Sequence, residues 1–485
     1  MKKYSKILIE FTLGFILLSL IPFMGCKKLV EVDNPNNRLL KSLVYSTDQT
    51  AIAVMNGVLV KLNSSSLTGS QLNSTPLITG LLGDELELND LNLSQELTNY
   101  FQNNLTPQGV PYANDIWANL YNQIFALNDL IEGVSSSSQL TGKVKTQLMG
   151  EAKFVRALLY FYLTNLYGDV AYAISTDYKR NSQLNRTAQQ KIYEYIISDL
   201  QVARDSLSET FLDGTLTNAS IERIRPTKWA ASALLAKVYL YTKNWKLAEA
   251  EATKVLNNTS LFHLDDLDQV FLKNSNEAIW QVQPTGDTYN TVDALFFIIP
   301  EGSGPNYSQP TCISKSLLNS FEVGDLRKEK WLNGTTDINT GITYYYPYKY
   351  KSYLPIDLST PLTEYNMMLR LADLYLIRSE ARAQLNDLIG ALNDLDTIRQ
   401  RAGLKKSEAK TKSSIITAIH QERKVELFVE WGDRWFDLIR NGEINDVMNI
   451  VTPEKGGTWS NFKKLLPISP SEIQYNSNLV QTPGY

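Results

Sequence analysis

The stretch "TKWAASALLAKVYLYTKNWKLAEAEATKVL", residues 227–256, decides the fold class. Each half of it places apolar and small residues at helical spacing. These residues are Leu235, Ala236 and Tyr239 in the first half and Trp245, Ala248, Ala252 and Val255 in the second. A turn at Lys243 and Asn244 separates the halves. The pattern fits the tetratricopeptide repeat of about 34 residues, in which two antiparallel helices pack closely. The stretch therefore predicts a helical hairpin.

Three further helical pairs flank this hairpin in the sequence. Residues 47–62 and 117–133 form the first pair, 151–168 and 189–207 the second, and residues 367–404 contain the last. Leu388 and Ala391 repeat the spacing of Trp245 and Ala248. Stacked helical pairs form superhelical scaffolds. We therefore predict a mainly α-helical fold built on four tetratricopeptide-like hairpins.

Three glycines are predicted to end helices in these pairs. Gly133 follows the pattern "WANLYNQIFALNDLIE", Gly168 follows a segment that is apolar almost all round, and Gly403 follows the last pair. Glycine is favoured after a helix because it adopts a positive φ without steric cost.

Two regions lack a helical period and are rich in Gly, Pro, Asn and Ser. They are residues 62–111 and 257–365, and the second includes the strand-like segments 277–284 and 294–300. We predict a loop-rich face with small β elements, and ligand-contacting residues concentrate on such loops. The aromatic and amide candidates for ligand binding are Tyr100, Phe101, Asn103, Tyr289, Tyr307, Trp331, Tyr345 and Tyr346. Tyrosine and tryptophan have an apolar face and a polar group, which suits sugars, peptides and partner proteins alike.

The N-terminus has the three parts of a secretory signal. "MKKYSK" is basic, Phe11–Met24 is apolar, and Gly25 precedes Cys26. The apolar run is shorter than the roughly 20 residues that span a membrane. We interpret residues 1–25 as a lipoprotein signal peptide and Cys26 as the lipidated N-terminus of the mature chain. A signal peptide followed by an incidental cysteine is the alternative.

Composition excludes several classes of partner and chemistry. The formal charge is −4, and removing residues 1–25 takes away three lysines and one glutamate, which leaves −6. An acidic chain has no electrostatic footprint for nucleic acid. Cys312 is the only cysteine besides Cys26, so a disulfide framework within one lipidated chain is not expected. No later segment reaches 18 uninterrupted apolar residues.

No catalytic motif is present in the sequence. The two histidines, His263 and His420, are far apart, and neither lies in a zinc or nucleophile motif. The acidic segments "GDELELND", 83–90, and "LDDLDQV", 264–270, leave a glycosidase carboxylate pair or a calcium site open. The segment "QERKVELFVEWGDRWFDLIRNGE", 421–443, predicts one helix whose arginines and carboxylates pair within the structure.

Several long blocks of the chain resemble the SusD/RagB family of outer-membrane nutrient-uptake lipoproteins. They are "EAKFVRALLYFYLTNLYGDV", "RPTKWAASALLAKVYLYTKNWKLAEAEATKVL", "NEAIWQVQ", "MLRLADLYLIRSEARAQLN", "IRQRAGL", "ERKVELFVEWGDRWFDLIR" and "LLPISPSEIQYNSNLVQTPGY". The resemblance implies a right-handed superhelical scaffold of four helical pairs with a variable ligand face. It also implies an N-terminal part, 26–220, and a C-terminal part, 221–485. Phe23 departs from the leucine common in lipoprotein signals, and Thr482 from an asparagine common in the closing block.

The resemblance also implies a function. Such proteins bind an oligomeric nutrient, most often a glycan, and deliver it to a SusC-like TonB-dependent transporter. We therefore expect a non-catalytic lipoprotein on the outward side of the outer membrane, with no cofactor besides the lipid on Cys26. The alternatives are a RagB-like peptide-binding protein, a tetratricopeptide scaffold that binds only protein, and a surface glycosidase.

Overall fold

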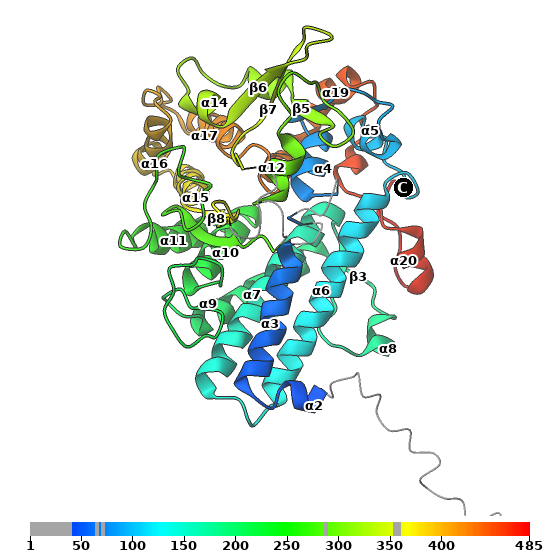
Figure 1. Cartoon of the computed structure of the whole chain (residues 1–485), viewed down its shortest axis with the longest axis vertical. Coiled ribbons are helices and arrows are strands. Elements are labelled where there is room, and N and C mark those ends of the chain that lie inside the picture. Colours follow the sequence, from blue (N-terminus) through cyan, green and yellow to red (C-terminus); the bar gives the residue numbers. More distant parts are fainter. Residues whose placement is uncertain (1–40, 64–66, 69–72, 286–289, 353–359) are drawn as a thin grey trace, which may run out of the picture. The chain divides into compact units, whose positions relative to one another are not determined.

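Helices dominate the structure, which is a computed structural model describing residues 41–63, 67–68, 73–285, 290–352 and 360–485 (Figure 1). The chain divides into two units, Met1–Val44 and Tyr45–Tyr485. The first unit contributes one described helix, α2 (Lys41–Val44). All elements below belong to the second unit, so the boundary predicted near residue 220 falls inside it. Residues 1–25 and Cys26 lie outside the described residues.

Nine helices of the second unit form the scaffold. They are α3 (Asp48–Asn63), α6 (Pro111–Ser136), α7 (Gly142–Tyr167), α9 (Gln189–Ser206), α10 (Lys228–Tyr241), α11 (Trp245–Leu256), α15 (Leu371–Gln384), α16 (Leu388–Arg401) and α17 (Lys412–Glu426). The pairs α3 with α6, α7 with α9, α10 with α11 and α15 with α16 each pack together. Further contacts join α6 to α7, α9 to α10 and α11 to α15, so the pairs form a continuous stack (Figure 1). The prediction of four tetratricopeptide-like hairpins is confirmed.

The third and fourth hairpins turn through residues with positive φ. Lys243 has φ +58° between α10 and α11, and Asn386 has φ +66° between α15 and α16. A left-handed residue reverses the chain tightly, and asparagine tolerates this conformation better than lysine does. The turn predicted at Lys243 and Asn244 is therefore present, although its left-handed residue is not a glycine.

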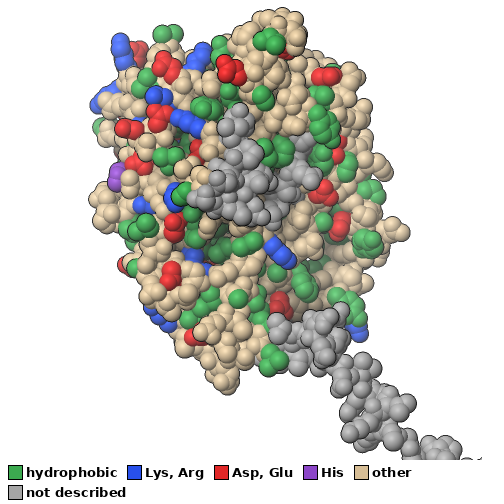
Figure 2. Space-filling view, in the orientation of Figure 1, with side chains coloured by type: hydrophobic (Ala, Val, Ile, Leu, Met, Phe, Trp, Pro, Cys, Tyr) green, Lys and Arg blue, Asp and Glu red, His purple; other side chains and the backbone are tan. Residues whose placement is uncertain are grey.

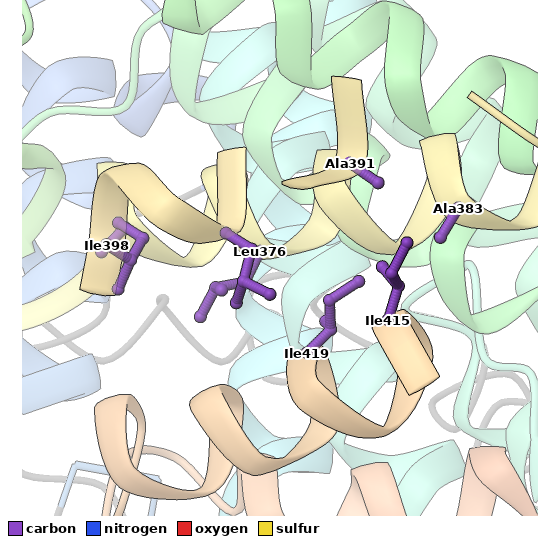
Figure 3. Close-up of a cluster of buried hydrophobic side chains, with 8 residues drawn as sticks. Leu376, Ala383, Ala391, Ile398, Ile415 and Ile419 are labelled. Atoms are coloured by element: carbon purple, nitrogen blue, oxygen red, sulfur yellow. The ribbon is translucent and has the colours of Figure 1, made fainter. Parts of the chain in front are cut away.

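A buried apolar cluster joins the last hairpin to α17 (Figure 3). Leu376 and Ala383 lie on α15, Ala391 on α16, and Ile415 and Ile419 on α17. All five side chains are fully buried. The alanines let α15 and α16 approach closely, and the isoleucines of α17 cover the pair. Each fully buried aliphatic side chain contributes about 1.5–3 kcal/mol.

Two of the three predicted helix ends are correct. Gly168 has φ +75° directly after α7, and Gly403 has φ +80° just beyond α16. The prediction for Gly133 is wrong, because α6 continues through it to Ser136. A Cβ on Gly133 would lie 2.1 Å from the Tyr45 ring. The glycine is therefore needed for close packing of this buried ring, whose hydroxyl donates to Asp129 at 2.8 Å.

Replacing Gly133 with alanine should lower the free energy of unfolding by about 1–3 kcal/mol, because the added methyl overlaps the Tyr45 ring. Gly57, in the middle of α3, is the matched control, since a Cβ there meets nothing within 4 Å. Gly57→Ala should stabilise by about 0.5–1 kcal/mol through backbone entropy. Urea unfolding followed by circular dichroism measures both. Equal effects of the two substitutions would contradict the packing role of Gly133.

The charge-dense segment 421–443 forms two helices where one was predicted. Helix α17 ends at Glu426, and α18 (Asp433–Asn441) begins after a turn in which Val429, Trp431 and Gly432 have positive φ. Long-range hydrogen bonds hold this turn: Val429 N donates to Glu85 Oε1 at 3.0 Å, and Trp431 Nε1 donates to the Met367 carbonyl at 2.6 Å. Tertiary contacts therefore override the local helical pattern.

Short elements make up the rest of the described chain. Around residues 73–101 they are α4 (Thr75–Leu82), β1 (Leu86–Leu88) and α5 (Gln95–Phe101). Between α7 and α9 they are β2 (Val170–Ala171), α8 (Tyr178–Asn181) and β3 (Arg186–Thr187). After α11 come β4 (Ala278–Val282), α12 (Val292–Phe297), β5 (Thr311–Ile313), α13 (Lys315–Leu318), α14 (Leu326–Lys330), β6 (Leu332–Thr336), β7 (Thr343–Pro347) and β8 (Asn366–Arg370). The C-terminal elements are α19 (Ile444–Glu454), the 3-10 helix η3 (Asn461–Lys464) and α20 (Pro470–Tyr475).

The strands form small antiparallel pairs, which are β1 with β5, β2 with β3, β4 with β8, and β6 with β7. Strand β4 confirms the prediction for residues 277–284. The strand predicted at 294–300 is wrong, because its first residues belong to α12, where the Thr291 side chain accepts from Ala294 N. A short apolar run does not distinguish helix from strand. The same ambiguity explains why the helical pair predicted at 367–404 includes most of strand β8.

Among the described residues, no helix combines the length and the apolar composition that crossing a membrane requires.

Candidate functional site

Each of the acidic segments 83–90 and 264–270 contains an aspartate that forms ion pairs with two basic side chains. Asp84 is buried, and its carboxylate oxygens form ion pairs with Arg434 Nε and Lys424 Nζ, each at 2.8 Å. Asp268 lies 2.6–2.7 Å from the ammonium groups of two lysines, Lys330 and Lys351. Within the described residues, no three His, Cys, Asp or Glu side chains group as metal ligands do. Asp84 and Asp268 therefore neutralise cations within the structure.

The two histidines lie in different environments. The His263 side chain is 60% exposed, and its Nε2 lies 3.7 Å from Asp265. His420 is largely buried, with Nδ1 2.8 Å from Glu443 and Nε2 3.9 Å from Glu380. Burial alone lowers the pKa of His420, but the interactions with Glu380 and Glu443 raise it to about 9. A protonated His420 between two carboxylates has a structural role.

The stability of the protein should decrease between pH 6.5 and 9 through His420. Its pKa is higher in the folded state than the usual 6.5, so its contribution is complete below about pH 6.5 and is lost as the pH rises through about 9. The change amounts to at most about 3 kcal/mol at 1.4 kcal/mol per pKa unit. Urea midpoints of wild type and His420→Gln across this range measure it. His263→Gln is the control and should keep the wild-type profile; an unchanged slope in His420→Gln would contradict the assignment.

Five of the predicted ligand-binding residues are buried. They are Tyr100, Phe101, Asn103, Trp331 and Tyr346. The Tyr100 hydroxyl accepts from Ala113 N at 2.7 Å, the Asn103 amide donates to the Leu82 carbonyl at 3.1 Å, and Trp331 Nε1 donates to the Leu267 carbonyl at 2.9 Å.

Tyr100, Asn103 and Trp331 have no exposed surface and hold the loops together. Phe101 and Tyr346 keep a small exposed surface, and Phe101 lines a cavity with Asp84 and Lys455. Ligand contact by these five residues stays a prediction. Two predicted residues are exposed, Tyr307 (72%) and Tyr345 (40%). Tyr289 lies outside the described residues.

Tyr307 is carried by a loop that the β6–β7 hairpin supports. Ile338 N donates to the Gly302 carbonyl at 3.1 Å, and Gly302 N donates to Thr335 Oγ1 at 2.8 Å. The Tyr344 ring lies against Gly304, where an added Cβ would be 3.0 Å away from it. Side chains alternate along a strand, so Tyr345 lies on the opposite face of the hairpin from Tyr344. The structure therefore separates Tyr345 from Tyr307.

Tyr112, at the start of α6, is partly buried and lies beside Glu96. Burial raises the pKa of the Tyr112 hydroxyl, and the neighbouring charges of Glu96, Tyr307 and Asp115 raise it further. The Tyr112 backbone N–H donates to the Glu96 carboxylate. Burial also raises the pKa of Glu96 to about 7. We call Glu96, Tyr112, Asp115 and Tyr307 the tyrosine site.

The sequence analysis missed Tyr112, Glu96 and Asp115. It began the long helix at Trp117, although the Val110–Pro111 dipeptide that precedes Tyr112 is a signal for a helix start, because proline is favoured in the first helical turn. The tyrosine site combines two aromatic faces with two carboxylates. Aromatic faces can stack on a hydroxyl-rich ligand, and carboxylates can accept hydrogen bonds from its hydroxyls.

The charge distribution also bears on the kind of ligand. On the face of the molecule in Figure 2, Lys and Arg side chains are mixed with Asp and Glu side chains, and hydrophobic side chains lie between them. A single extended basic patch is not visible among the described residues of this face, and such a patch is what nucleic-acid binding requires.

Comparisons with known proteins agree with the fold. Residues 317–485 match the SusD family, and residues 36–240 match the family described as "Starch-binding associating with outer membrane". SusD-like protein P2 of Formosa agariphila is 27% identical, and the alignment covers 100% of both chains. A SusD superfamily protein of Bacteroides vulgatus superposes with a TM-score of 0.75 at 19% identity, covering 90% of this chain and 99% of the other. A laminarin binding SusD-like protein superposes with a TM-score of 0.74 at 22% identity, covering 91% and 100%.

These matches cover the two ends of the chain and the whole fold. The block beginning "LLPISPSEIQ" lies in the first match, and the helices α3, α6, α7, α9 and most of α10 lie in the second. Because the sequence matches and the stacked hairpins agree, the chain belongs to the SusD/RagB family.

Proposed function

We propose that this protein is an outer-membrane lipoprotein that binds a glycan at the tyrosine site and delivers it to a SusC-like TonB-dependent transporter. The observation that carries the proposal is the exposed Tyr307 ring on a loop that the β6–β7 hairpin supports, together with the partly buried Tyr112, whose backbone N–H donates to Glu96. The laminarin binding relative and the starch-binding family description support a glycan as the class of ligand.

Binding at this site needs no covalent step. Sugar rings present C–H faces that stack on tyrosine, and their hydroxyls donate to carboxylates. Glu96 is already engaged by the Tyr112 backbone N–H, which fixes the carboxylate relative to the ring. A site with fixed geometry loses less conformational entropy when a ligand binds. The protein then acts as a non-enzymatic capture protein.

Membrane attachment and transfer are further parts of the proposal. Cys26, after removal of residues 1–25, would carry the acyl chains, and each buried methylene contributes about 0.8 kcal/mol to anchoring. The family description "associating with outer membrane" supports this location. An outward-facing anchored protein beside a transporter raises the local ligand concentration at the entrance of that transporter.

Replacing Tyr307 with alanine should weaken glycan binding about tenfold or more, because the substitution removes an exposed stacking face. The measurement is isothermal titration of the full chain in detergent against plant, fungal and host oligosaccharides and peptides, with each mixture assayed for cleavage. Tyr178→Ala is the matched control, since Tyr178 is also 72% exposed but lies on α8.

Three results of this titration would overturn the proposal. Products from any glycan would indicate a glycosidase, and saturable binding of peptides alone would indicate a RagB-like peptide carrier. Equal affinities of Tyr307→Ala and wild type would remove the tyrosine site from ligand binding.

A further inference from the structure

A second groove lies along α6. Its walls come from α6, from the β2 and α8 region, and from α20 and the residues after it, and its volume is about 310 Å³. Figure 1 labels α6, α8 and α20. The part of its lining that belongs to α6 runs from Trp117 to Asn128, which is about 8 to 24 Å along the helix from Tyr112 at 1.5 Å per residue. Phe125 is about 20 Å from Tyr112 on this scale.

Aromatic side chains form the floor and two edges of this groove. Trp117 and Tyr121 pack with ring centroids 4.9 Å apart. Trp117 Nε1 donates to Glu472 at 3.3 Å, and the Tyr121 hydroxyl donates to the Ala171 carbonyl at 2.7 Å, so both rings are fixed. At the edges, Phe125 is 49% exposed and Tyr475 is 79% exposed. Rings this exposed are available for stacking.

Polar groups in the groove remain available for a ligand. The Asn181 amide nitrogen donates to the Ser175 carbonyl at 2.8 Å, which fixes that side chain. Asn122 lies in the groove and is exposed, and no described residue hydrogen-bonds to its amide. The lining thus combines aromatic faces with side-chain amides, as is typical of small-ligand sites of 300–1,000 Å³.

The charge of the groove lining limits which sugars can bind there. Glu472 is the one formally charged residue among the described residues that line the groove. A carboxylate disfavours uronic acids and sulfated sugars through like-charge repulsion, whereas it accepts hydrogen bonds from neutral hydroxyls. The groove of Arg204, Lys228 and Lys254, which is also lined by acidic side chains, offers no comparable pair of exposed rings.

We infer that the groove between α6, α8 and α20 is a second binding site, which takes one or two units of a neutral sugar. Phe125 and Tyr475 stack on the sugar, and Asn122 and Glu472 bind its hydroxyls. The inference rests on the residues of the groove and does not depend on the tyrosine site. A glycan long enough to reach both Phe125 and Tyr112, which are about 20 Å apart along α6, would be held at two points, which raises its overall affinity.

The test uses the full chain carrying Tyr307→Ala, so that the tyrosine site is weakened. Saturation-transfer NMR with laminaribiose, cellobiose and mannobiose at millimolar concentration detects the remaining binding. A saturable signal with at least one of these sugars is expected. It should fall at least fivefold when Phe125→Ala and Tyr475→Ala are added. Leu247→Ala is the matched control, because Leu247 is 47% exposed on α11 and should leave the signal unchanged.

Each other outcome overturns the inference. No signal with any neutral disaccharide, or a signal that the groove substitutions do not change, would exclude a sugar site. Equal binding of a glucuronic-acid disaccharide would contradict the argument from Glu472. Protection of Tyr475 from chemical labelling by a partner protein, but not by sugars, would assign the groove to protein docking. The isothermal titration that compares wild type with Tyr307→Ala tests the proposed function separately from this inference.

Discussion

Replacing Glu426 with alanine should lower the free energy of unfolding by about 3–5 kcal/mol, which is typical of breaking a buried ion pair. Glu426 is fully buried at the end of α17. Its carboxylate pairs with three guanidiniums, from Arg327 at 2.8 Å, from Arg370 at 2.6 Å and from Arg401. These arginines come from three separate parts of the chain, so one carboxylate joins the loop-rich region to the last helical hairpin.

The large loss of stability is expected because Glu426→Ala leaves buried guanidinium groups without this carboxylate partner. Burial alone raises the pKa of Glu426, but Arg401, Arg370 and Arg327 hold it well below its usual range. Alanine removes the charge and leaves the guanidiniums less well compensated in a region without solvent. The stabilisation from Glu426 should be present above about pH 4.3 and should be lost as the pH falls below that value.

The matched control is an ion pair at the surface. Lys191 and Glu194 lie 2.6 Å apart on α9, and each side chain is at least half exposed. Lys191→Ala should leave the stability close to that of the wild type, because solvent screens an exposed ion pair. Urea midpoints and thermal unfolding of both variants give the comparison. If Glu426→Ala unfolds like Lys191→Ala, the buried network does not stabilise the fold, and the interpretation of the arginine-rich segment fails.

Replacing Trp331 with alanine should destabilise the protein by about 3–5 kcal/mol, as is typical of large cavities in a core. The Trp331 ring is fully buried and packs edge-on against Phe271 with centroids 5.5 Å apart. Lys349 Nζ lies 5.0 Å from the ring, and the indole N–H donates to the Leu267 carbonyl. The substitution removes this packing and a cation–π contact together.

Tyr345 is the matched comparison for Trp331, because both residues are aromatic and lie in the same Gly- and Asn-rich region. Its ring is 40% exposed on β7. Tyr345→Ala should change stability by no more than about 0.5 kcal/mol. Because Tyr345 faces away from Tyr344, it should also leave affinity at the tyrosine site unchanged. A Trp331→Ala variant that melts like wild type but loses ligand affinity would contradict the burial of Trp331.

The helical hairpins were predictable because their signal is local. The period of apolar residues in 227–256 and 367–404 depends only on which residues share a helix face. Gly168 and Gly403 likewise act through their own backbone conformation. Gly133 has the same residue type but a different role, which depends on Tyr45, 88 residues away in the chain. The break at 427–432 similarly depends on hydrogen bonds to Glu85 and Met367.

The ligand candidates show the limit of this reasoning. Tyr307 and Trp331 occur in similar loop-rich sequence, yet one ring is exposed and the other is buried. Exposure of a loop aromatic depends on which distant segments cover it, and periodicity contains no information on that. The electrostatic interaction of Tyr112 with Tyr307, nearly 200 residues later, is likewise not contained in any local pattern.

The sequence by itself determined the class of scaffold, its tight turns and its family, because periodic faces and contiguous motif blocks are properties of neighbouring residues. Only the tertiary structure decided which aromatics are exposed, that segment 421–443 breaks into two helices, and that Glu426 joins three arginines. These features depend on contacts between segments far apart in the chain, and the packing of the whole fold sets those contacts.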